Sequence, residues 1–168
     1  MRGDSGRGLL EAADLHDVKK LRRRARIGPV KKWPISSYRA WRWRACSTSA
    51  THGSPHFAPD LAGWRRERMP TRPAGAISVV PDWVCGIFSP TTRRHDHLVK
   101  MPFYAWIGVA FAWLVDAESR LVFAHRLDAG EWRPIGTYSD EVEARIPPFD
   151  AAPLNIAAWW MATEESSP

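Results

Sequence analysis

The order of apolar runs in the second half of the chain is the feature that most restricts its fold. A strand-like run, PDWVCGIFSP at 81–90, precedes the helix-like stretch TTRRHDHLVKMPFYAWIG, and the buried-strand pattern AFAWLVD follows at 110–116. A strand pattern at 120–127, the turn signal Asp128-Ala129-Gly130 and a strand pattern at 131–139 together predict a hairpin. Strands, one helix and further strands predict an α/β or α+β domain with a mixed sheet.

The segments on either side of this region give weaker patterns. HFAPDLAGWRRER predicts a short strand that carries Asp60, and a Pro/Arg-rich loop follows it. DEVEARIPPFD at 140–150 predicts a last short strand, and APLNIAAWWM at 152–161 predicts a closing helix. Near the start, residues 9–26 predict a helix, because apolar residues fall near one face and Gly28-Pro29 would end it.

Charge is distributed unevenly along the 168 residues. Residues 1–56 hold 13 Lys/Arg against 4 Asp/Glu, a net +9, whereas residues 57–168 hold 11 against 14, a net −3. A basic segment attracts polyanions through phosphate contacts and counterion release. The alternative is a solvated basic tail.

Residues 27–56 show no clear period. Trp33, Trp41 and Trp43 are interleaved with lysines and arginines, and such a mixture can stack on single-stranded nucleic acid. The alternative is an unusual composition in a poorly folded segment.

Cysteine use and hydropathy bear on the compartment. Cys46 and Cys85 have no metal-type spacing, and a disulfide framework is not expected, which fits a reducing cytoplasm. The longest apolar run, 107–115, is far shorter than the roughly 20 residues of a membrane helix. The first residues contain no apolar signal-peptide region, so we expect a cytoplasmic protein without a membrane partner.

Three stretches resemble a known family: PDLAGWRRERMP, then PDWVCGIFSPTTRRHDHLVKMPFYAWIGVAFAWLVDAESRLVFAHRLDAGEW, then PPFDAAPLNIAAWW. They are similar to the Uma-type restriction endonucleases, small bacterial proteins with a PD-(D/E)XK nuclease-like fold. The resemblance implies a restriction-endonuclease-like mixed sheet flanked by helices over residues 57–162. It leaves residues 1–56 as an unmatched basic segment and 163–168 as a polar tail. The early strands of the family are therefore expected to be absent or replaced, which makes the fold incomplete at its N-terminus.

The resemblance also implies an active site. Asp60 corresponds to the metal-binding aspartate, and Lys100 corresponds to a lysine that has moved from the sheet onto the following helix. Gly86 stands where the family motif has a glutamate, and Asp96 stands where an acid commonly lies four residues before the lysine. The implied cofactor is Mg²⁺, which binds through one or two carboxylates plus substrate phosphate. With Gly86 in place of a carboxylate, we expect weak metal binding.

The residues themselves are compatible with this arrangement. Strand alternation would place a side chain at position 86 on the face of Val84 and Phe88, where it could meet a strand bearing Asp60. In a helix, Asp96 and Lys100 are spaced to form an i, i+4 pair. Pro102 either kinks that helix or marks its start. The alternatives are that Asp60 is a surface acid and that Lys100 is a solvated lysine. Asp82 is expected to cap the strand entry rather than bind metal.

The expected function is metal-dependent hydrolysis of DNA, impaired by the glycine at position 86. The first alternative is a non-catalytic nucleic-acid-binding module on a degenerate nuclease fold, and the second is a decaying gene product without function. Candidate phosphate contacts are Arg65, Arg66, Arg93 and Arg94, with solvated loop charge as the alternative. An exposed sheet edge would favour self-association, so a homodimer is also considered.

Overall fold

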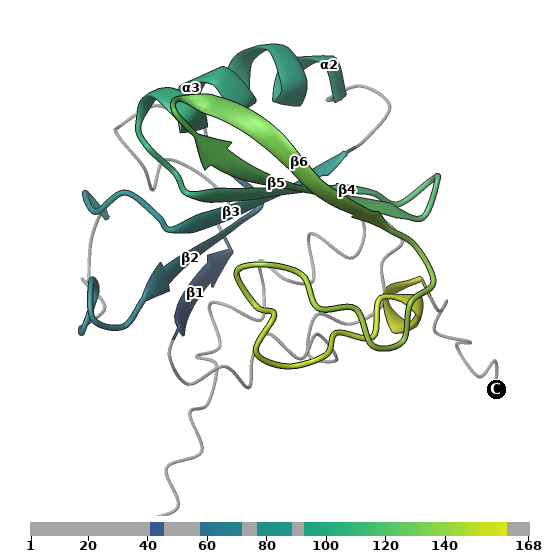
Figure 1. Ribbon diagram of the computed structural model, residues 1–168. Helices are drawn as coiled ribbons and strands as arrows, with labels where there is room; N and C mark the ends of the chain where they lie inside the picture. Colours follow the sequence, from purple (N-terminus) through teal and green to yellow (C-terminus); the bar gives the residue numbers. More distant parts are fainter. Residues whose placement is uncertain (1–40, 46–57, 72–76, 89–92, 161–168) are drawn as a thin grey trace, which may run out of the picture.

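The computed structural model describes residues 41–45, 58–71, 77–88 and 93–160, which build a six-stranded sheet and a helical crossover (Figure 1). Among these strands β3 and β4 are parallel, and the other neighbouring pairs are antiparallel. The predicted mixed sheet is therefore confirmed. The strands follow one another across the sheet in chain order: β1 (Trp41–Ala45), β2 (Leu61–Arg65), β3 (Trp83–Phe88), β4 (Phe111–Asp116), β5 (Leu121–Asp128) and β6 (Glu131–Tyr138).

A helical crossover joins the parallel pair, because two parallel strands cannot be connected by a tight turn. It consists of α2 (Arg93–His95), the π-helical turn η4 (Asp96–Lys100) and α3 (Met101–Trp106), as the helix-like pattern predicted. Pro102 lies in the first turn of α3, directly after the helical turn η4, and it has no N–H to donate back into that turn.

The β5–β6 hairpin turns at the predicted position. Ala129 and Gly130 both have positive φ angles, 48° and 83°. Two such residues give the turn whose twist matches that of the strands they connect. The pairing of the two strands shifts register between Ala124 and His125.

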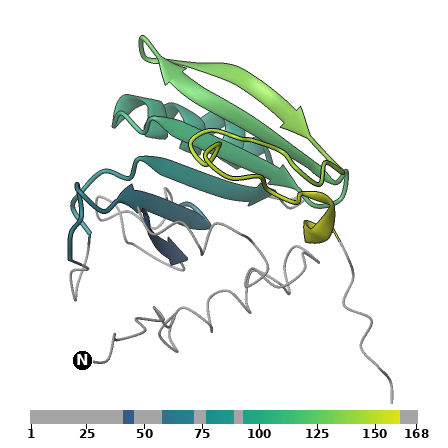
Figure 2. The same ribbon diagram turned by 60° about the horizontal axis from the view of Figure 1, so that its bottom comes forward.

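The two faces of the sheet bury different clusters. Val84 and Phe88 of β3 pack with Met101 and Tyr104 of the crossover and with Leu114 of β4. The opposite face is covered by the segment that follows β6, which Figures 1 and 2 show in yellow across the sheet from the helices. There the rings of Trp83, Trp113 and Phe149 meet edge to face, with centroids 5.1–5.3 Å apart.

The C-terminal segment differs from the prediction. The strand expected within 140–150 is a single bridge between Ala144 and Leu154, and the helix expected at 152–161 is one 3₁₀ turn, Ala157–Trp159. Proline lacks the N–H that a sheet ladder or a helix interior needs, and PPFDAAP contains three of them. The apolar residues of this segment are nevertheless buried, so it contributes to the core as irregular chain: Ile146, Phe149, Leu154, Ile156 and Trp159.

The sheet also begins earlier than the sequence indicated. β1 pairs with β2 over Trp41–Ala45, inside the segment that the resemblance left unmatched, so the boundary at residue 57 is placed too late. Trp41 is buried and its ring lies 4.9 Å from that of Phe149. The helix predicted at 9–26 and the tail at 163–168 lie outside the described residues. Within those residues, no helix has the length and hydropathy required to cross a bilayer.

Candidate active site

Asp60 lies directly before β2 and reaches the backbone of β3. The antiparallel register pairs Leu61 with Cys85, so the next position along places Asp60 beside Gly86. Its Oδ2 accepts a hydrogen bond of 2.7 Å from the backbone N–H of Ile87. The structure thus brings together Asp60 and Gly86, two of the positions that the resemblance implied for the active site.

Gly86 is buried in the middle of β3, and the backbone does not require glycine there. It pairs with Leu114 of β4, and positive φ angles occur at other glycines of the described chain, Gly108 and Gly130. A Cβ atom at position 86 would lie 3.5 Å from Leu114 Cδ2, an ordinary contact, and no other heavy atom of the described residues beyond its chain neighbours would lie within 4 Å. A Cβ atom at position 86 is therefore compatible with the strand.

Lys100 lies on the crossover that covers this face. Its Nζ is 2.7 Å from Oδ1 of Asp96, the i, i+4 pair that the spacing predicted. Asp96 is almost fully buried, and the Lys100 side chain is 18% exposed. Met101, the next residue, packs in the cluster of Val84 and Phe88. The ammonium group is thus held on the segment above the strand that carries Gly86.

Comparison with known sequences identifies the family. The model of the family described as "Uma2: Putative restriction endonuclease" matches residues 40–157, most of the chain. The chain belongs to the Uma2 family. The match begins one residue before β1, which agrees with the inclusion of that strand in the sheet.

A solved structure shares the fold of this Uma2-family chain. It is the crystal structure of "a putative nuclease belonging to DUF820" from Anabaena variabilis, with a TM-score of 0.53 and 16% sequence identity. The alignment covers 90% of this chain and 82% of that one. At this identity the likeness shows the fold alone. The search among curated proteins gave no match.

Asp60 gives the candidate site a carboxylate, and position 86 provides none. In the part of the chain that the structure describes, no three His, Cys, Asp or Glu side chains come together as metal ligands. At the Asp60 position, one carboxylate oxygen already accepts the N–H of Ile87, and Gly86 supplies no second carboxylate. Mg²⁺ depends on such carboxylates and gives up its water reluctantly. His95 and His97, on either side of Asp96, are both exposed.

The thiol beside Asp60 is not a nucleophile. Burial raises the pKa of Cys85 well above its ordinary value, and the negative charge of Asp60 raises it further. Because the reactive form of cysteine is the thiolate, the neutral Cys85 is a core residue.

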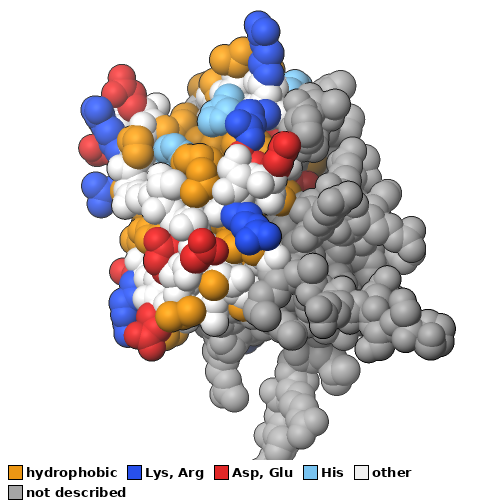
Figure 3. Space-filling view, turned by 90° about the vertical axis from the view of Figure 1, so that its right-hand side faces the viewer, with side chains coloured by type: hydrophobic (Ala, Val, Ile, Leu, Met, Phe, Trp, Pro, Cys, Tyr) orange, Lys and Arg blue, Asp and Glu red, His pale blue; other side chains and the backbone are white. Residues whose placement is uncertain are grey.

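The four candidate phosphate contacts separate into two pairs. Arg65 ends β2, about 17 Å along the strand from Asp60 at about 3.4 Å per residue, and Arg66 follows it in the turn. Arg93 and Arg94 begin the crossover that follows the Gly86 end of β3. Figure 3 shows Lys, Arg and His side chains gathered over the helical part of the molecule. The second pair is therefore the one placed near the candidate site.

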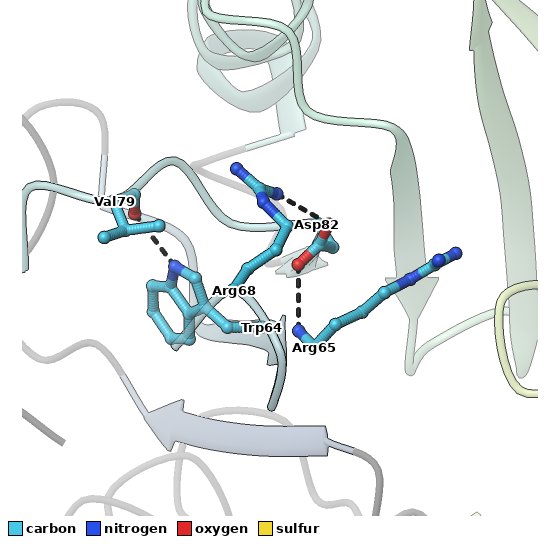
Figure 4. Close-up of polar contacts among 5 residues, drawn as sticks. All are labelled: Trp64, Arg65, Arg68, Val79 and Asp82. Carbon is cyan, nitrogen blue, oxygen red and sulfur yellow. Dashed lines mark hydrogen bonds and ion pairs between the residues drawn. The ribbon is translucent and has the colours of Figure 1, made fainter. Parts of the chain in front are cut away.

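The Arg65 end of β2 is organised by Asp82 (Figure 4). The carboxylate of Asp82 accepts hydrogen bonds from the backbone N–H of Arg65 at 2.9 Å and from Nη1 of Arg68 at 2.6 Å. Trp64 Nε1 donates to the carbonyl of Val79 at 2.8 Å beside it. Asp82 thus stabilises the connection between β2 and β3, as its expected role in capping the strand entry suggested.

Sequence reasoning missed Asp116, the last residue of β4. It is 3% exposed, and its Oδ1 accepts backbone N–H groups of Glu118 and Ser119 at 3.2 Å each. Its Oδ2 forms an ion pair with Arg93. The signal in the sequence is an acid that directly follows a buried apolar strand, in AFAWLVD, with a polar turn after it.

Proposed function

We propose that this Uma2-family chain is a metal-dependent DNA endonuclease by descent, whose hydrolytic step is impaired by the glycine at position 86. Membership of the family and the nuclease-like fold support a nuclease. The observation that carries the impairment is local. Asp60 is held against β3 beside a glycine that the backbone does not require and where a Cβ atom meets only an ordinary contact among the described residues.

The chemistry explains why one missing carboxylate matters. Phosphodiester hydrolysis needs an activated water and stabilisation of the negative charge that develops on the phosphate. Lys100, fixed by Asp96, offers a preorganised positive charge for the second task. Asp60 offers one carboxylate for the first, the smaller of the one or two carboxylates that hold Mg²⁺ together with substrate phosphate. We therefore expect little cleavage from the natural chain.

A second candidate is binding of nucleic acid without cleavage. It is favoured by the same absence of a ligand set within the described residues and by the basic start of the crossover, where Arg93 and Arg94 are both exposed. Contacts to phosphate alone give binding that tolerates many sequences and weakens steeply with salt. Tight binding to one sequence that does not depend on salt would contradict this candidate.

The two candidates are separated by nicking of supercoiled plasmid in Mg²⁺ or Mn²⁺. The natural chain is compared with Gly86→Glu, which supplies the missing carboxylate, and with Gly86→Gln, which has the same shape without the charge. We expect cleavage from Gly86→Glu above both other proteins. Lys100→Ala in the Gly86→Glu background should remove the gain.

The result of this comparison is decisive in both directions. If Gly86→Glu and Gly86→Gln nick equally little while plasmid binding persists, position 86 is not the vacated ligand position and the binding module is the better description. If the natural chain nicks as fast as Gly86→Glu, the glycine does not impair the site.

A further inference from the structure

Arg93 is held in place by a buried acid. Its Nη2 pairs with Oδ2 of Asp116, whose side chain is 5% exposed, whereas the Arg93 side chain is 50% exposed. Asp116 is itself fixed, because its other oxygen accepts the backbone N–H groups of Glu118 and Ser119. A guanidinium group has five N–H donors in a rigid plane. The pair with Asp116 uses one side of that plane and leaves half of the side chain facing solvent.

The ring of Phe88 fixes the same guanidinium from another direction. Arg93 Cζ lies 5.5 Å from the centroid of Phe88, and the imidazole of His97 lies 4.9 Å from that centroid. A cation over an aromatic face is held there by electrostatic attraction. Phe88 follows Gly86 by two residues on the same face of β3, a separation of about 7 Å along the strand.

We infer that Arg93 is a preset contact for a nucleic-acid phosphate next to the candidate cleavage position, and that Asp116 is the positioning residue that orients it. The inference rests on the proposed function for the identity of the ligand, a phosphodiester backbone. It adds a specific subsite at the end of β3, built by Phe88, Arg93 and Asp116. Arg94, which directly follows and is exposed, forms no such pair in the described structure.

Positioning and net charge predict opposite signs for one substitution. Asp116→Asn removes a negative charge near the phosphate, so charge alone would make anion binding tighter. If Asp116 acts by orienting Arg93, the same change makes binding weaker, because the guanidinium loses the partner that fixes it. Glu118→Gln is the matched control, since it removes one charge from an exposed residue of the same β4–β5 turn without contacting Arg93 through its side chain.

The experiment measures binding of a short fluorescein-labelled DNA duplex by anisotropy, at low and physiological salt, in EDTA so that cleavage does not interfere. Asp116→Asn should weaken binding by about tenfold, the loss of one charge-assisted hydrogen bond, and Glu118→Gln should leave it unchanged or slightly tighter. Arg93→Lys keeps the charge but loses the planar fork, and it should weaken binding as Asp116→Asn does. Arg94→Lys should not.

Thermal melting shows if each variant is folded. If Asp116→Asn does not fold, the binding measured for Arg93→Lys tests the inference in its place. Binding by Asp116→Asn as tight as the natural chain, or equal effects of Arg93→Lys and Arg94→Lys, would overturn the inference. The proposed nuclease function can fail separately. In that case Gly86→Glu does not nick plasmid, while Asp116→Asn and Arg93→Lys still bind the duplex more weakly than the natural chain. A natural chain that binds no duplex at low salt overturns the inference as well.

Discussion

Asp60 and Ile87 are joined by a hydrogen bond of 2.7 Å from the backbone N–H of Ile87 to the Asp60 carboxylate, across the gap between β2 and β3. This bond fixes an acid beside Gly86, the residue before Ile87. A carboxylate introduced at position 86 would therefore enter a buried place next to an existing negative charge. Both burial and a like charge disfavour its ionised form, and a bound cation would relieve both effects.

The first prediction is that Gly86→Glu makes folding stability depend on metal. Without metal, the variant should melt below Gly86→Gln, because burial penalises its charge. Added Mg²⁺ or Mn²⁺ should raise its melting temperature, since a ligand that binds only the folded state stabilises it by about 2.7 kcal/mol at a hundredfold excess over Kd. Differential scanning fluorimetry with a metal titration measures this. An identical response of the two variants to metal would contradict the second-ligand role of position 86.

The second prediction is that Gly86→Ala stabilises the chain. A glycine inside a strand loses more backbone freedom on folding than alanine, and here the backbone angle and the 3.5 Å contact to Leu114 accept a Cβ. The expected gain is about 0.5–1 kcal/mol in the free energy of unfolding, measured by urea denaturation. A loss of stability would show that the strand needs glycine at this position, and the interpretation of Gly86 as a vacated ligand position would lose its structural support.

The third prediction is that the irregular segment after β6 is integral to the core. Phe149 is fully buried and meets Trp83 and Trp113 edge to face, so Phe149→Ala should cost about 3–5 kcal/mol of unfolding free energy. Val142→Ala is the matched control on the same segment, because Val142 is 62% exposed. Equal urea midpoints for the two variants would show that the segment does not stabilise the sheet.

The sequence predicted the parts of the fold whose backbone follows from local pattern. β3, β4, the β5–β6 hairpin and the helical crossover all have apolar runs with clear ends, and each was expected close to its observed bounds. The segment after β6 was not, because apolar residues recur there as they would in a strand or helix while its prolines prevent either. Ile146 and Ile156 are buried in irregular chain, so their positions follow neither the helical nor the strand period that sequence reasoning uses.

β1 was missed for a different reason. In WRWRA, tryptophan and arginine alternate with the period of a strand, but arginine-rich sequence before residue 57 suggested a basic segment outside the core. At the candidate site, the neighbourhood of Asp60 and Gly86 and the Asp96–Lys100 pair followed from alternation and i, i+4 spacing. The Arg93–Asp116 pair joins residues 23 positions apart, which only the parallel register of β3 and β4 brings together.

The fourth prediction concerns acid stability and Asp116. Burial by itself raises the pKa of Asp116, but hydrogen bonds from Ser119 and Glu118 together with the charge of Arg93 outweigh it and lower that pKa. A carboxyl group with a lowered pKa in the folded state stabilises that state above its unfolded pKa of about 3.9. This stability is lost as the pH falls through the lower, folded value.

The difference in unfolding free energy between the natural chain and Asp116→Asn should therefore be constant from pH 7 to about 5 and shrink below about pH 4. A gap independent of pH down to the acid transition would show that the charge of Asp116 does not stabilise the fold.

The fifth prediction places a second pH dependence near neutrality, at His125. Burial lowers the pKa of His125, the nearby His97 lowers it further, and backbone hydrogen bonds at Phe123 and Ala112 oppose the change without cancelling it. The folded state therefore keeps the imidazole neutral at a pH where the unfolded chain already binds a proton, at about 6.5 and below. Stability is complete above that value and falls as the pH drops toward the folded pKa. Unfolding free energies from urea titrations at pH 8 to 5 should decline for the natural chain as the pH falls, and they should decline less for His125→Gln.

The control is His95→Gln, which changes an exposed histidine of the crossover and should leave the decline unchanged. If His125→Gln keeps the full decline and His95→Gln removes it, the pH dependence comes from the surface of the crossover and not from the histidine beneath it.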